Sequence, residues 1–230
     1  MGSLDAREAL PTGVKVEIWS DVVCPWCYIG KRRFEAALRD FPHPVEVTWK
    51  SFQLDPAATS APAGGHVAHL AEKYGRTTEQ AQQMVDSVTA AAAAEGLAYR
   101  LDIARSGNTF DAHRLLHLAK AQGVQDALKE RLDRAYFTEG EAVDDAETLT
   151  RLAVEVGLEE SQVTAVLGSD RYADDVRADV DEAHALGITG VPFFVIDRRY
   201  AVSGAQPAEL LRQALVQAAD GAELPVSRGA

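Results

Sequence analysis

The strand-forming segments of this sequence lie in two groups, one near each end of the chain, with a long helical stretch between them. Residues 14–19 and 45–52 are rich in β-branched and alternating apolar residues, which predicts two strands. The apolar spacing of three and four residues after Pro25 predicts a helix between them, and a strand–helix–strand unit predicts a parallel pair. Residues 193–197 and 200–203 predict a hairpin, followed by an amphipathic helix from Pro207 to about Ala219.

Neither end could bury its strands alone, so we expect both groups to form one sheet in an α/β fold. A Pro-, Ala- and Gly-rich linker runs from Leu54 to Gly65, and the sequence from there to Gly187 has helical periodicity with glycines at expected helix ends. We therefore predict a discontinuous domain made of residues 12–60 and 188–222, interrupted by a helical insertion domain at residues 65–187.

Composition and charge exclude several classes of protein. Hydrophobic residues make up 47% and charged residues 25% of the chain, which is typical of a globular protein. The net charge of −12 disfavours binding to nucleic acid or to an anionic membrane surface. No apolar run is long enough to span a membrane. The first residues, MGSLDAREALPTG, lack the features of a secretion signal, so we expect a cytoplasmic protein.

The chain has two cysteines, Cys24 and Cys27, and they are three positions apart. A disulfide scaffold would need many more cysteines, and a zinc ribbon would need a second pair. The pair therefore predicts a local redox site. Two alternatives stay open: the cysteines could be small buried apolar residues, or half of a zinc site between two molecules.

The position of the pair at the start of a helix assigns a role to each thiol. Cys24 would cap the helix and Pro25 would be its first residue, a position that tolerates proline. The helix dipole favours a thiolate there, so Cys24 is predicted to be the nucleophile and Cys27 the resolving thiol. Asp21 would raise the pKa of Cys24 if its carboxylate were near, but we expect it to point away.

These motifs resemble those of the DsbA family of thioredoxin-fold oxidoreductases, and within it the FrnE-like proteins. The resemblance rests on four segments: Ser20–Lys31 (SDVVCPWCYIGK), Ser51–Pro56 (SFQLDP), Asn108–Leu115 (NTFDAHRL) and Gly190–Phe194 (GVPFF). It implies a thioredoxin-like fold with a large helical insertion. It also implies that Cys24 is the nucleophile, that Cys27 resolves the mixed disulfide, and that Pro192 is a cis-proline beside them.

The same reading gives a set of candidate substrate-binding residues. They are Pro25, Trp26, Val191, Phe52, Asn108 and His113. Core packing is the alternative for the apolar members, and a helix cap is the alternative for Asn108. His113 and His117 share a helix face, but no further ligand accompanies them, so we predict no metal site.

The predicted function is a thiol–disulfide oxidoreductase, an isomerase or reductase of protein or peptide disulfides. No tightly bound cofactor is expected, and glutathione or a thioredoxin-type system would supply electrons. Two alternatives are a glutathione-dependent isomerase or transferase, of the hydroxychromene-carboxylate isomerase or kappa-class type, and a non-catalytic binding module. The helix dipole and the neutral Trp26 together predict a Cys24 pKa of roughly 5 to 7, with the pair mostly dithiol in a reducing cytosol.

Overall fold

A computed structural model gives the fold, and it describes residues 13–60 and 65–221 of the 230-residue chain. The leading segment, for which no secretion signal is predicted, lies outside the described residues, as does part of the predicted linker. Among the described residues, no helix combines the length and apolarity needed to cross a membrane.

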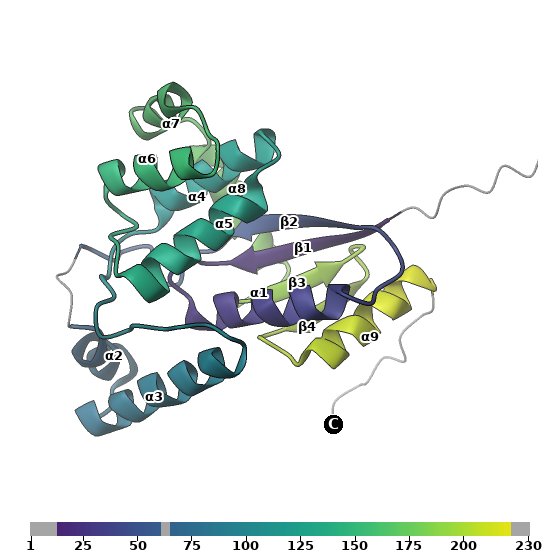
Figure 1. The fold of residues 1–230 in the computed structure, drawn as a ribbon, viewed down its shortest axis with the longest axis horizontal. Helices are drawn as coiled ribbons and strands as arrows, with labels where there is room; N and C mark the ends of the chain where they lie inside the picture. Colours follow the sequence, from purple (N-terminus) through teal and green to yellow (C-terminus); the bar gives the residue numbers. More distant parts are fainter. Residues whose placement is uncertain (1–12, 61–64, 222–230) are drawn as a thin grey trace, which may run out of the picture.

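The two ends of the described chain share one four-stranded sheet, as predicted (Figure 1). Its strands are β1 (Val14–Ser20), β2 (Val45–Ser51), β3 (Phe193–Ile196) and β4 (Tyr200–Ser203), in the order β2-β1-β3-β4. β1 pairs in parallel with β2 and antiparallel with β3, which places Ile18 between Trp49 and Phe194. This arrangement confirms the α/β fold class with a thioredoxin-like sheet.

Helices α1 (Pro25–Leu38) and α9 (Ala208–Ala219) cover one face of the sheet and contact each other. Alternate residues of β1 face them: Val14, Val16 and Ile18 are buried, whereas Lys15 is exposed. These side chains pack with Phe34 of α1 and Leu211 of α9 into a single apolar cluster. Burial of this face positions α1, whose N-terminus carries the two cysteines.

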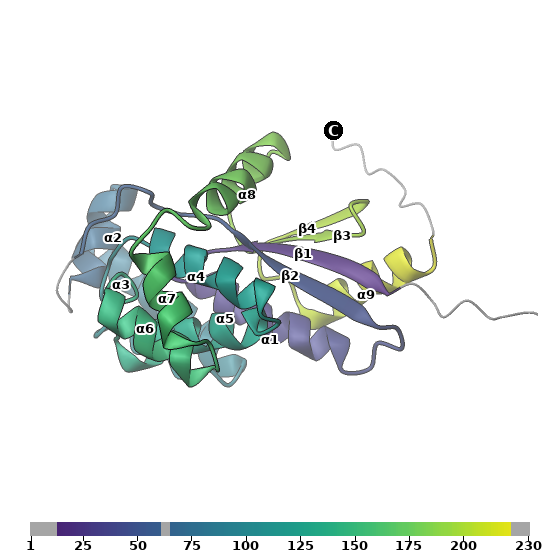
Figure 2. The same ribbon diagram turned by 90° about the horizontal axis from the view of Figure 1, so that it is seen from above.

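The chain between β2 and β3 is helical, as predicted, and lies mainly beyond one end and one edge of the sheet (Figure 2). Its helices are α2 (His66–Tyr74), α3 (Thr78–Ala94), α4 (Phe110–Ala121), α5 (Gln125–Arg134), the π-helix η1 (Ala135–Glu139), α6 (Ala146–Glu155), α7 (Glu160–Leu167) and α8 (Ala173–Ala185). The apolar faces of α2 to α7 form a second cluster that also includes Tyr28 and Ile29 of α1, whereas Ala183 of α8 packs in a third cluster with Trp19. One helix therefore belongs to the core of the sheet and to the core of the helical block.

Candidate active site

Cys24 and Cys27 lie where the end of β1 leads into α1. Cys24 is the N-cap of the helix and Pro25 is its first residue, as the sequence predicts. The backbone N–H of Cys27 donates to the Cys24 carbonyl at 3.0 Å, which closes the first turn and brings both thiols to one end of the helix. Both cysteines are free thiols, and both are buried, with Cys24 3% and Cys27 0% exposed.

The loop before β3 closes over Cys24. The Val191–Pro192 peptide bond is cis, and the Cys24 thiol donates to the Val191 carbonyl at 3.4 Å. The Pro192 carbonyl accepts from Gly204 N at 2.8 Å, which fixes the loop against the segment after β4. Gly30 of α1 packs against the proline ring so closely that an added Cβ would lie 2.8 Å from Pro192 Cγ. Cys24, the predicted nucleophile, and the proline loop are therefore held together by direct contacts.

The pKa of Cys24 lies well above its ordinary value, which corrects the prediction of roughly 5 to 7. A hydrogen bond with the Cys27 side chain is the largest cause, and burial is the second. The charges of Cys27 and then Asp21 add to the effect, whereas the backbone N–H of Cys27 opposes it. The Cys24 sulfur makes no capping hydrogen bond, so the helix N-terminus does not outweigh burial in the dithiol protein.

Asp21 does not point away from the site, which corrects a second expectation. It is 1% exposed, and its carboxylate accepts from Val22 N and Leu54 N, both at 2.8 Å. It also pairs with His113 Nε2 at 3.2 Å. The three contacts join the loop after β1, the segment after β2 and helix α4 beside the nucleophile.

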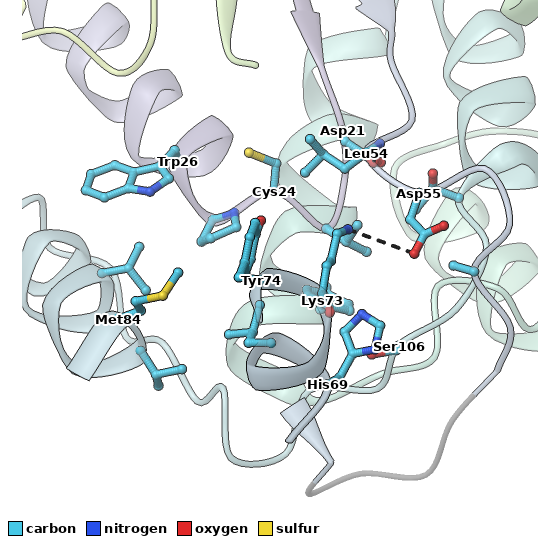
Figure 3. Close-up of a pocket in the computed structure, with 18 of the residues that line it drawn as sticks. Asp21, Cys24, Trp26, Leu54, Asp55, His69, Lys73, Tyr74, Met84 and Ser106 are labelled. Carbon is cyan, nitrogen blue, oxygen red and sulfur yellow. Dashed lines mark hydrogen bonds and ion pairs between the residues drawn. The ribbon is translucent and has the colours of Figure 1, made fainter. Parts of the chain in front are cut away.

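A cavity of about 970 Å³ opens beside Cys24 (Figure 3). Cys24, Trp26 and Val191 line one wall, and residues of α2, α3 and the turn between them line the opposite wall. Four exposed apolar side chains surround this cavity: Trp26, Leu54, Tyr74 and Met84, each between 39% and 54% exposed. An apolar patch of this kind is typical of a binding site.

The structure brings half of the predicted substrate-binding residues to this cavity. Pro25, Trp26 and Val191 line it. Phe52 is instead buried beside Trp19 and Val195 on the far face of the sheet.

Asn108 and His113 have internal partners. The Asn108 carboxamide accepts from Phe110 N and Gln53 Nε2 and donates to the Pro56 carbonyl. It therefore caps the start of α4 and connects it to the segment after β2. His113 is 1% exposed and cannot contact a substrate from there, which corrects its prediction as a binding residue. His117 pairs with Asp179 rather than with the carboxylate that binds His113, so the two histidines do not converge.

Sequence reasoning missed three residues at the site. Tyr99, in the segment before α4, donates its hydroxyl to the Pro25 carbonyl at 2.6 Å. Lys73 of α2 and Arg76, just after α2, line the cavity opposite Cys24. None of the three belongs to a motif, and each reaches the site through packing of the helical block.

Comparison with known proteins agrees with this geometry. The DSBA-like thioredoxin domain family matches residues 15–216. A crystal structure of a probable DsbA oxidoreductase from Streptomyces coelicolor is 52% identical, covers 93% of each chain and superposes with a TM-score of 0.85. The protein YwbO of Bacillus subtilis is 28% identical over 80% of this chain and 86% of its own.

A more distant structure shares the fold. The cytosolic disulfide reductase DsbM of Pseudomonas aeruginosa is 16% identical, with a TM-score of 0.62 over 90% of this chain and 96% of its own. It has also been solved with glutathione.

Proposed function

Because the chain belongs to the DSBA-like thioredoxin domain family, we propose that it is a thiol–disulfide oxidoreductase acting as a disulfide reductase or isomerase. The observation that carries the proposal is the placement of Cys24. This residue lies at a helix N-terminus and lines a cavity with an apolar patch, and its sulfur contacts the loop of the cis Pro192. Cys27 lies one turn further along α1, and we assign it the role of resolving the mixed disulfide.

The reaction follows from the two thiols. The Cys24 thiolate attacks one sulfur of a substrate disulfide, so a Cys24–substrate bond forms and the first substrate thiolate leaves. Cys27 then loses its proton and attacks Cys24. The Cys24–Cys27 disulfide forms, and the second substrate thiolate leaves. Two electrons pass from the protein dithiol to the substrate, and the leaving thiolates take protons from solvent.

The raised pKa of Cys24 favours reduction over oxidation. A stabilised thiolate stabilises the reduced protein and makes the disulfide a strong oxidant. Here burial and the neighbouring thiol destabilise the thiolate, so the dithiol gives up its electrons more readily. We place this activity in the cytoplasm, with glutathione or a thioredoxin-type system as the source of electrons. Protein or peptide disulfides fit the apolar patch around Cys24.

Cysteine variants test the proposal directly. Cys24→Ser is expected to abolish reduction of insulin disulfides, because no nucleophile remains. Cys27→Ser is expected to accumulate mixed disulfides with substrate, visible as mass adducts, because attack persists and resolution does not. If both variants turned over like the unmodified protein, the assignment of roles would be wrong.

A parallel assay separates the alternatives. A glutathione-dependent isomerase or transferase would conjugate or isomerise its substrate in the Cys27→Ser variant, since that chemistry needs no resolving thiol. A non-catalytic binding module would show neither activity. Insulin reduction that requires both cysteines would exclude both alternatives.

A further inference from the structure

The cavity beside Cys24 has two unlike walls, and the wall opposite the cysteine carries positive charge. Lys73 and His69 of α2 lie on this wall (Figure 3), and Arg76, just after α2, also lines the cavity. The chain as a whole carries a net charge of −12, so two neighbouring cations in the lining of this cavity run against its average charge. We call Lys73 and Arg76 the cationic wall.

The carboxylates that line the cavity have partners in the protein. Asp21 is buried and accepts hydrogen bonds from two backbone amides while pairing with His113. Asp55 accepts from Ala57 N and pairs with Lys73. Asp55 therefore offsets part of the charge of Lys73, whereas no carboxylate of the cavity pairs with Arg76 among the described residues.

The two cations of the wall have fewer partners within the protein than these carboxylates have. The Lys73–Asp55 contact is long, at 3.9 Å, and both side chains are about one-third exposed. Arg76 follows the left-handed Gly75 that ends α2, and its side chain is exposed, with no ion pair among the described residues. The cavity that Cys24 lines thus contains a guanidinium without an ion pair among the described residues and a weakly held ammonium.

The size of the cavity limits which molecules can contact Cys24 and the cationic wall at the same time. A volume of about 970 Å³ suits a molecule of a few residues rather than a folded surface. An arginine side chain binds carboxylates through paired N–H donors, and lysine adds a point charge. We propose that this cavity selects small disulfides that carry carboxylates, with the disulfide at Cys24 and a carboxylate at the cationic wall.

This inference rests on the proposed function, because the same Cys24–Cys27 dithiol is the reductant. The electron balance is unchanged: two electrons leave the dithiol, the substrate S–S bond breaks, and two carboxylate-bearing thiols are released. When glutathione disulfide is the substrate, glutathione is the product, so the thioredoxin-type system is then the source of electrons. The cationic wall takes no part in bond making. Lys73 and Arg76 are positioning residues that set which disulfides reach Cys24.

Three small disulfides of different charge test the selection in single turnover with the reduced protein. Glutathione disulfide is anionic, hydroxyethyl disulfide is neutral and cystamine is cationic. The unmodified protein is expected to react fastest with glutathione disulfide and slowest with cystamine. The double variant Lys73→Glu, Arg76→Glu is expected to slow glutathione disulfide by about tenfold and to accelerate cystamine, while hydroxyethyl disulfide changes little.

Two control proteins separate local from general effects. Lys120→Glu with Arg39→Glu makes the same change in net charge at exposed positions that do not line the cavity, and should leave the order of the three disulfides intact. Lys73→Arg with Arg76→Lys keeps both charges and should retain the preference for glutathione disulfide, with the change confined to KM.

The outcomes are distinct. Equal loss of rate with all three disulfides in the Glu variant would overturn the proposal, because the wall would then be structural. Unchanged rates with all three would also overturn it, because the anion would bind elsewhere. Failure of the unmodified protein to reduce hydroxyethyl disulfide, which needs no charge recognition, would instead contradict the proposed oxidoreductase function.

Discussion

The carboxylate of Asp21 lies in a fixed position beside Cys24. Its side chain is buried and engaged by Val22 N, Leu54 N and His113, so it cannot swing into solvent. Its charge is one of the causes that raise the pKa of Cys24. A single residue therefore ties three segments together and makes the neighbouring thiolate less favourable.

Asp21→Asn is expected to lower the pKa of Cys24, since the substitution removes a negative charge from its surroundings. Thiolate absorbance followed against pH measures this directly. The variant should also lose about 1–3 kcal/mol of unfolding free energy, because an amide cannot accept from all of the donors that the carboxylate holds. His113→Gln keeps the Asp21 carboxylate and should cost stability without lowering the Cys24 pKa. A Cys24 pKa that stayed the same or rose in Asp21→Asn would show that this carboxylate does not act on the sulfur.

Gly30 keeps the proline loop close to α1. An alanine there would place its Cβ 2.8 Å from Pro192 Cγ, which is too short for two carbon atoms. We expect Gly30→Ala to shift the loop, lengthen the contact between Cys24 and Val191, and cost about 1–3 kcal/mol of stability with a loss of activity. Gly190→Ala is the matched control, because no atom lies within 4 Å of the Cβ it would add. Activity and urea-unfolding curves equal for the two variants would contradict this role of Gly30.

The carboxylate of Asp179 is one of the groups that attach helix α8 to the sheet. This carboxylate accepts from Lys50 Nζ at 2.5 Å and Ser51 N at 2.9 Å, and pairs with His117 of α4 at 3.1 Å. Burial alone would raise its pKa, but these donors outweigh burial and hold the pKa at about 2. The group joins α4, α8 and β2 at one point.

Asp179→Asn is expected to cost about 2 kcal/mol at pH 7, which corresponds to the depressed pKa. An acid whose pKa is lowered on folding stabilises the protein above its unfolded pKa, and this contribution is lost as the pH falls towards its folded pKa. The difference in unfolding free energy between the variant and the unmodified protein should therefore become smaller as the pH falls from about 4 to about 2. Urea unfolding at several pH values measures it. Asp174→Asn, on the same helix with a side chain 98% exposed, should change stability by less than about 0.5 kcal/mol, and an equal loss in both variants would contradict the argument.

The elements could be predicted from sequence because each has a local pattern. Alternation marks β1, and the Cys24-Pro25 start marks α1. Contacts between distant segments have no such pattern. Asp21 meets His113 across 92 positions, and the placement of α2 and α3 opposite Cys24 depends on how the whole helical block packs. The misprediction of the Cys24 pKa has this reason only in part: burial of the thiol, its second cause, is a tertiary property, whereas the largest cause is the hydrogen bond with the nearby Cys27.

At the scale of the molecule, α1 links two apolar cores. Its residues Phe34 and Ala37 pack in the cluster of the sheet, whereas Tyr28 and Ile29 pack in the cluster of the helical block. Neither core is closed without this helix. We therefore expect the sheet and the helical block to unfold together, although the sequence predicts them as two domains.

Two spectroscopic signals distinguish one transition from two. All three tryptophans of the chain, Trp19, Trp26 and Trp49, lie in β1, α1 and β2. The indole N–H groups of Trp19 and Trp49 donate to Asp179 of α8 and Asp126 of α5, so fluorescence reports on the sheet and on its junction with the helical block. Far-ultraviolet circular dichroism reports mainly on the helical block, which holds most of the helices. We expect the two urea-unfolding curves to coincide, as a cooperative transition requires. Ile29→Ala, which opens a cavity in the helical core from within α1, should lower both midpoints together, with a loss of about 2–4 kcal/mol. Separate midpoints in the unmodified protein, or a shift of the dichroism curve alone in the variant, would show that α1 does not couple the two cores.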